Sequence, residues 1–138
     1  MTVPQRLTIA EVGEFSFVPP VVASAATRYQ RLREIERSHL AQMARHNLVQ
    51  DWTSETREVV LDARESIFEA REARDEFRTQ VREFVQALRA NREPLPAVLR
   101  YTRAMLQLLE RSGALESDGG WLEAEVLEWA IEEFETVA

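Results

Sequence analysis

The chain of 138 residues contains no cysteine, which excludes disulfide bonds, thiolate metal sites and a cysteine nucleophile. It also contains no lysine, so all 17 basic residues are arginine. We attribute this bias first to a GC-rich bacterial genome and second to a need for planar, bidentate guanidinium groups. Glycine and proline are scarce, at four and five residues, as expected of a folded chain with little irregular structure.

No stretch approaches the roughly 18 consecutive apolar residues that a membrane span needs. The first residues also lack the basic and apolar regions of a secretory signal. We therefore expect a cytoplasmic protein without membrane contact. A composition of 45% hydrophobic and 30% charged residues is that of a globular protein, and the length fits one domain.

Residues 1–20 differ in pattern from the rest of the chain. Phe15 and Phe17 lie on one face of an extended segment that Pro19 and Pro20 close. The prediction is an extended N-terminal arm over 1–20, which either packs on the helices or binds another molecule, and a single helical-bundle domain over 21–138.

Apolar residues recur at spacings of three and four over about 21–50 and again over about 55–92. The second stretch holds a heptad seam, whose members are Val60, Ala63, Ile67, Ala70, Arg74, Phe77, Val81, Phe84 and Leu88. These two stretches predict a long antiparallel helical hairpin.

Two shorter helices are expected after the hairpin, over about 97–112 and 121–136. Pro94 and Pro96 stop the long helix, and Gly113 ends the next helix at a left-handed position. The fold class is therefore all-α: a long hairpin plus two C-terminal helices in a bundle. Because the long helix outruns its sequential partner, we also expect a homodimer or higher oligomer. The small Ala63 and Ala70 of the seam allow close helix approach, either within the hairpin or in an antiparallel dimer.

Charge is distributed unevenly along the chain. Every residue after Arg111 is acidic or uncharged, whereas Arg57, Arg64, Arg71 and Arg78 recur every seven residues on the long helix, and Arg82 and Arg89 continue the row. The preferred interpretation is that the acidic last helix lies along this row, or that the arginines pair with neighbours such as Glu58 and Glu65 and are solvated. The alternative is that the row or the acidic helix binds another protein of opposite charge.

Nucleic acid is a less favoured partner for the arginine row. The chain is acidic overall, and the spacing predicts a stripe of glutamates on the opposite face of the same helix. The members of this stripe are Glu58, Glu65, Glu72, Glu76 and Glu83.

One pattern is compatible with metal chemistry. Glu36 and His39 have the i, i+3 spacing of di-iron carboxylate bundles, and His46 follows on the same stripe. Such a bundle needs two of these motifs and two further glutamates, and the chain has one motif. The competing interpretation is an ion pair of Glu36 with Arg71 or Arg74 and a hydrogen-bonded histidine.

No nucleotide-binding glycine loop or nucleophile elbow is present, so we predict neither enzymatic activity nor a cofactor. The sequence favours a non-catalytic helical adaptor or subunit that binds a protein partner of unknown identity. The candidate contact residues are Phe15, Phe17, Arg57, Arg64, Arg71, Arg78, Trp121, Glu125, Trp129 and Glu132.

Overall fold

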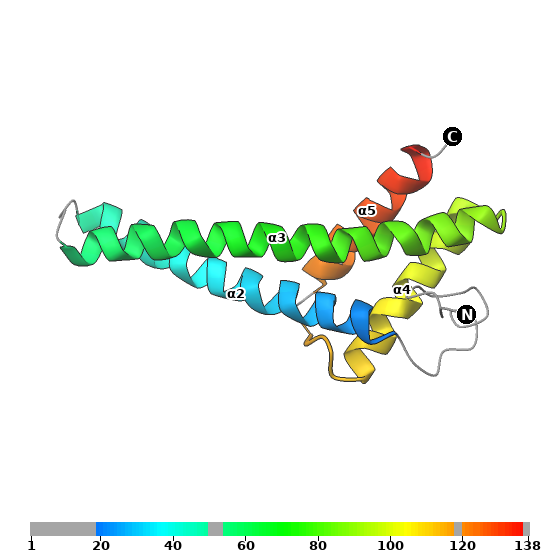
Figure 1. Ribbon diagram of the computed structural model, residues 1–138, viewed down its shortest axis with the longest axis horizontal. Helices are drawn as coiled ribbons and strands as arrows, with labels where there is room; N and C mark the ends of the chain where they lie inside the picture. The colour runs from blue at the N-terminus through cyan, green and yellow to red at the C-terminus, as the bar shows by residue number, and fades with distance from the viewer. Residues whose placement is uncertain (1–18, 50–53, 118–119, 137–138) are drawn as a thin grey trace. The chain divides into compact units, whose positions relative to one another are not determined.

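The computed structural model describes residues 19–49, 54–117 and 120–136, and within these ranges it contains helices and no strand (Figure 1). The helices are α2 (Pro20–Val49), α3 (Ser54–Ala90), α4 (Leu95–Arg111) and α5 (Trp121–Thr136). The all-α prediction is confirmed, and the expected helix ends lie within about two residues of the observed ones. The predicted N-terminal arm falls almost entirely outside the described residues.

None of the described helices is long and apolar enough to cross a membrane. The chain divides into two compact units. The hairpin unit is Arg28–Asp75, and the bundle unit combines Met1–Thr27 with Glu76–Ala138. The prediction of a single domain over 21–138 stays a prediction.

In the hairpin unit, α2 and α3 run antiparallel side by side (Figure 1). A hydrogen bond between Nδ1 of His39 and Oγ of Ser66 joins the two helices. The buried side chains of this unit are mostly small, which allows close approach of the helices; they are Tyr29, Val59, Ala63, Ser66, Ala70 and Ala73.

The seam of α3 differs in one respect from the predicted heptad. Ala73 is fully buried, whereas Arg74, which the spacing placed in the seam, is exposed. The same shift by one residue occurs at Val59 and at Ser66, which are buried where Val60 and Ile67 were expected to be. The physical reason is that an alanine fits between close helices, whereas a guanidinium without a partner is costly to bury.

The bundle unit holds the larger side chains of the core. Residues from α3, α4 and α5 contribute, and the largest of those that are fully buried are Phe77, Val81, Val85, Leu88, Val98, Met105, Leu109 and Val126. Helices α4 and α5 pack on each other. The start of α2 also belongs to this unit, and the hydroxyl of Thr27 donates to the carbonyl of Ala114 at 2.7 Å.

Helices α3 and α4 end in the same hydrogen-bond pattern. The residue in the left-handed conformation after the helix differs between the two. After α3, the amides of Arg92 and Glu93 donate to the carbonyls of Arg89 and Leu88, and Arg92 has a φ of 61°. After α4, Gly113 occupies the corresponding position at a φ of 85°, as predicted. Both ends are Schellman motifs, but only glycine adopts this conformation without steric cost.

Candidate protein-binding surface on α3

The second half of the arginine row is used inside the bundle unit. Nη2 of Arg78 donates to Oε2 of Glu132 at 2.6 Å, and Nε of Arg82 lies 3.4 Å from Oε2 of Glu133. Arg89 donates to the carbonyl oxygen of Phe134, and its guanidinium lies 4.9 Å from the centroid of that ring. Along this stretch of α3, the preferred interpretation is confirmed: the acidic last helix lies along the arginines.

The first half of the row, in the hairpin unit, has a different environment. Arg57, Arg64 and Arg71 are exposed, and none of them takes part in an ion pair with any residue that the structure describes. These side chains therefore remain open to solvent or to a partner.

Two large hydrophobic side chains lie beside these arginines. Leu61 is 61% exposed and Phe68 is 63% exposed, although both are on the same helix as the buried seam. At 100° per residue, the two side chains point in directions that differ by only about 20°. They form a short apolar strip on the side of α3 that faces away from the hairpin core.

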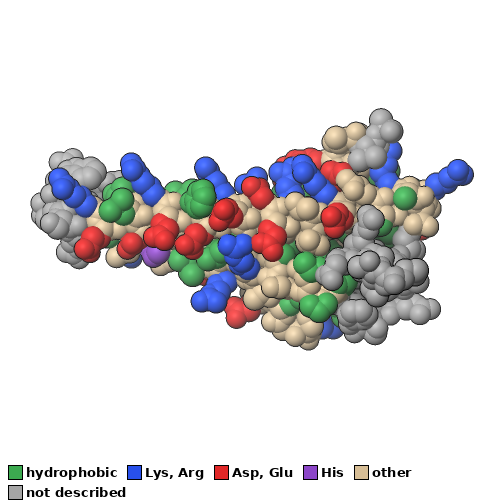
Figure 2. Space-filling view, in the orientation of Figure 1, with side chains coloured by type: hydrophobic (Ala, Val, Ile, Leu, Met, Phe, Trp, Pro, Cys, Tyr) green, Lys and Arg blue, Asp and Glu red, His purple; other side chains and the backbone are tan. Residues whose placement is uncertain are grey.

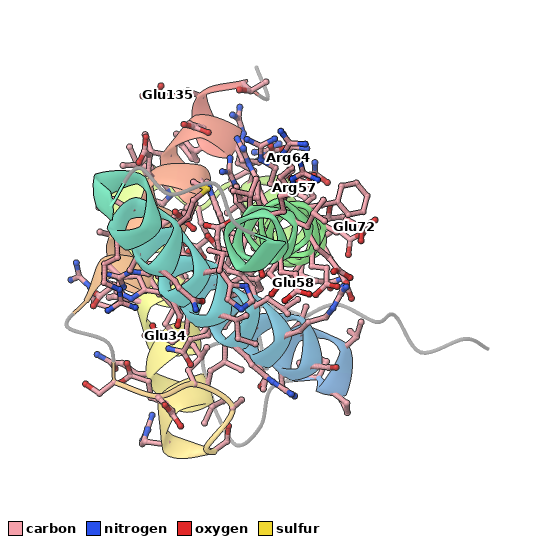
Figure 3. The ribbon with its side chains drawn as sticks, turned by 90° about the vertical axis from the view of Figure 1, so that its left-hand side faces the viewer. Glu34, Arg57, Glu58, Arg64, Glu72 and Glu135 are labelled. Atoms are coloured by element: carbon pink, nitrogen blue, oxygen red, sulfur yellow. The ribbon has the colours of Figure 1, made fainter. Side chains whose placement is uncertain are left out.

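Acidic residues flank the other side of this strip. In Figure 3, Arg57 and Arg64 are labelled above α3, Glu72 to its right and Glu58 below it. Each of these glutamates directly follows an arginine in the sequence, so on a regular helix the centres of the two rows are about 100° apart.

We call this surface the outer face of α3. It consists of an arginine row, an apolar strip and a glutamate row, with the members Arg57, Arg64, Arg71, Leu61, Phe68, Glu58, Glu65 and Glu72. Figure 2 shows this side of the hairpin unit, with basic side chains along one edge, acidic ones gathered along the other and hydrophobic ones between.

The metal alternative is centred on Glu36, which lies on α2 in the hairpin unit. Glu36 borders a cavity of about 320 Å³ between α2 and α3, which Arg71 and Arg74 also line, but it forms no ion pair with either arginine. The predicted ion pair is therefore not formed in the hairpin unit.

His39, the second member of the motif, is hydrogen-bonded to Ser66, as the competing interpretation predicted. Over the described ranges, no three histidine, aspartate or glutamate side chains come close enough together to hold a metal ion. The side chain of His46 lies outside the described residues.

Three of the remaining candidate contact residues, Trp121, Glu125 and Trp129, belong to α5. Trp129 is only 5% exposed and packs edge to face on Phe77. Trp121 and Glu125 are half-buried, and each interacts with another group of the chain. Phe15 and Phe17 lie outside the described residues.

Leu61 and Phe68 are the residues that the sequence analysis missed. They do not belong to the buried seam, so a search for core periodicity passes over them. A usable signal was present, because each stands four residues after an arginine of the row and three after the glutamate that follows that arginine.

The fold and this surface define a class: an all-helical bundle protein with an amphipathic helix face left exposed. Comparison with known proteins gives no match, since no protein-family model fits the chain and no curated protein or solved structure is significantly similar to it.

Proposed function

We propose that this chain is a non-catalytic helical protein, an adaptor or a subunit of a larger assembly, that acts by binding protein through the outer face of α3. The observation that carries the proposal is the pair of exposed side chains Leu61 and Phe68, set between two rows of opposite charge.

Exposed single hydrophobic residues are common, so the argument rests on their arrangement. A leucine and a phenylalanine seven residues apart on one helix face have the geometry of anchors for a partner helix. Aromatic anchors surrounded by polar groups are also the usual source of binding energy at protein interfaces.

The charged rows favour protein over nucleic acid as the partner. Glu58, Glu65 and Glu72 stand beside the arginines on the same face, where they would repel a phosphate backbone. A protein surface with charges of both signs can pair with both rows. The metal alternative has no support from the described residues.

The proposal also includes the N-terminal arm and the oligomeric state that the sequence predicted. The arm with Phe15 and Phe17 is proposed as a second contact element, and a homodimer or higher oligomer as the form of the protein. Trp129, Arg78 and Glu132 contribute to packing inside the bundle unit, so we do not assign them to the interface.

The proposal is tested by cross-linking of the full chain through its carboxylates with a dihydrazide linker, because the chain has no lysine or cysteine side chain. The linker is applied to the purified chain and to the chain added to an extract of its source cells. We expect covalent adducts that involve the hairpin unit in the wild-type chain and their loss in the Leu61→Glu, Phe68→Glu double variant. Both substituted positions are exposed, so the variant should keep the helical circular dichroism of the wild type.

A matched control introduces the same charge on the exposed side of α2 through Ser38→Glu and Ala41→Glu. This control should retain every adduct of the wild-type chain. Identical adduct patterns for wild type and for the Leu61→Glu, Phe68→Glu variant, in both samples, would contradict the proposal.

A further inference from the structure

The outer face of α3 carries a repeat of seven residues. The pairs Arg57-Glu58, Arg64-Glu65 and Arg71-Glu72 are spaced seven apart, and the first two are followed three positions later by Leu61 and Phe68. On a helix, the arginine row lies about 50° to one side of the apolar strip and the glutamate row about 50° to the other. The face is thus an apolar centre with flanks of opposite charge.

We propose that the occupant of this face is a second copy of the same chain, packed with its α3 parallel and in register about a two-fold axis. This inference rests on the proposed function, because it names the partner of that same surface. The reason is charge complementarity of the face with itself.

The sign of the charges on each flank selects the orientation. When two helices pack in parallel, the flank on one side of the first helix meets the flank on the other side of the second, so arginines face glutamates along both edges. When they pack antiparallel, equal flanks meet, and arginines face arginines. Self-association through this face is therefore favoured in parallel and opposed in antiparallel orientation.

The acidic edge gives a second reason for a cationic neighbour. Glu58 and Asp62, and likewise Glu65 and Glu69, have the i, i+4 spacing that brings like charges together on a helix surface. The arginine row of a second copy would lie along this edge and reduce the repulsion.

The buried seam of α3 is not available for contact with a second copy of the chain. Ala63 and Ala70, which the sequence analysis offered to an antiparallel dimer, are buried within the hairpin unit at 1% and 4% exposure. The outer face from Arg57 to Glu72 extends over about 23 Å of helix. An interface this short is expected to be weak and concentration-dependent.

The first test is sedimentation equilibrium of the full purified chain over a concentration series that reaches about 0.5 mM, chosen because short interfaces bind weakly. We expect the weight-average mass to rise from one chain toward two for the wild type and for the Ser38→Glu, Ala41→Glu control. The Leu61→Glu, Phe68→Glu variant should stay at one chain. A wild-type mass that stays at one chain throughout would overturn the inference.

The second test exchanges charge on one flank at a time. One variant carries Arg57→Glu, Arg64→Glu and Arg71→Glu, and the other carries Glu58→Arg, Glu65→Arg and Glu72→Arg. Each alone should associate at least tenfold more weakly than the wild type, and an equimolar mixture should restore a mixed dimer in native mass spectrometry. If either variant alone forms dimers as abundantly as the wild type does, the proposed role of the charged flanks is wrong.

The third test fixes the orientation and exploits the absence of natural cysteine. In a parallel, in-register dimer, Leu61→Cys lies opposite its own copy and should oxidise to a disulfide-linked dimer. In an antiparallel dimer centred on the face, Leu61→Cys would instead cross-link only with Phe68→Cys. The second result would overturn the parallel arrangement.

The two proposals fail in different ways. If the purified chain stays monomeric but adducts in the extract still depend on Leu61 and Phe68, the face binds a different protein and the second-copy inference is wrong. If neither self-association nor any adduct depends on these residues, the proposed function is wrong as well.

Discussion

Phe77 of α3 and Trp129 of α5 meet edge to face, with ring centroids 5.9 Å apart and ring planes at 77°. The guanidinium of Arg78 lies 5.9 Å from the centroid of the same tryptophan ring. A single aromatic side chain thus joins the apolar core of the bundle unit to the paired half of the arginine row.

Removal of this aromatic contact should be among the most damaging changes in the chain. We expect Trp129→Ala to lower the free energy of unfolding by about 3–5 kcal/mol, because it empties a buried aromatic site. Denaturant unfolding followed by circular dichroism measures the loss. Trp129→Phe keeps a ring in the site and should cost clearly less, so equal losses for both variants would contradict the packing of Phe77 on Trp129.

The two helix ends give a pair of opposite predictions. Arg92→Gly should raise the free energy of unfolding by about 1 kcal/mol, because it relieves a left-handed conformation that disfavours a side chain. Gly113→Ala should lower it by about 1 kcal/mol for the same reason. Among the described residues, no atom lies within 4 Å of the position that a Cβ on Gly113 would take, so the effect would come from the backbone.

Urea unfolding of the two variants measures both changes. An Arg92→Gly variant less stable than the wild type would show that the side chain of Arg92 contributes more than its backbone conformation costs.

The bond between His39 and Ser66 should hold the hairpin unit together in a measurable way. Ser66 is buried, so Ser66→Ala removes the partner of a half-buried imidazole and should cost about 1 kcal/mol. Combining it with His39→Leu should recover much of the loss, because both polar partners are then replaced. Thermal unfolding monitors the series, with the exposed Ser38→Ala as control. Strictly additive effects of the two changes would contradict a direct bond.

The two units should differ in local stability. The hairpin unit buries mainly small side chains, whereas the bundle unit buries rings and long aliphatic side chains such as Phe77, Met105 and Leu109. Less buried apolar surface gives a lower free energy of local opening.

Amide hydrogen exchange read by mass spectrometry tests this difference. We expect faster exchange in residues 28–45 and 57–72 than in the cores of α4 and α5, measured at low chain concentration. Equal protection in both regions would mean that the chain opens as one cooperative unit.

Much of the fold followed from local signals. The proline residues Pro94 and Pro96 and the left-handed Gly113 act on their own backbone, so the ends of the long helix and of α4 were predictable within about two residues. The side of α3 that becomes the seam was less predictable, since a shift of one position separates Ala73 from Arg74.

The candidate surface was predictable only in part. The spacing of Arg57, Arg64 and Arg71 is visible in the sequence, and all three side chains are exposed in the structure. Leu61 and Phe68 were not identified, because exposure depends on where the neighbouring helix lies and not on the residue type.

The sequence by itself determined the helices and the regular spacing of the arginines, because both depend on residues a few positions apart along one helix. The tertiary structure alone decided that Arg78 is paired while Arg64 is open to a partner, although the two have the same place in the repeat. The physical reason is that the pairing of Arg78 requires α5, which is distant in sequence, to pack beside α3. No local pattern specifies such a contact.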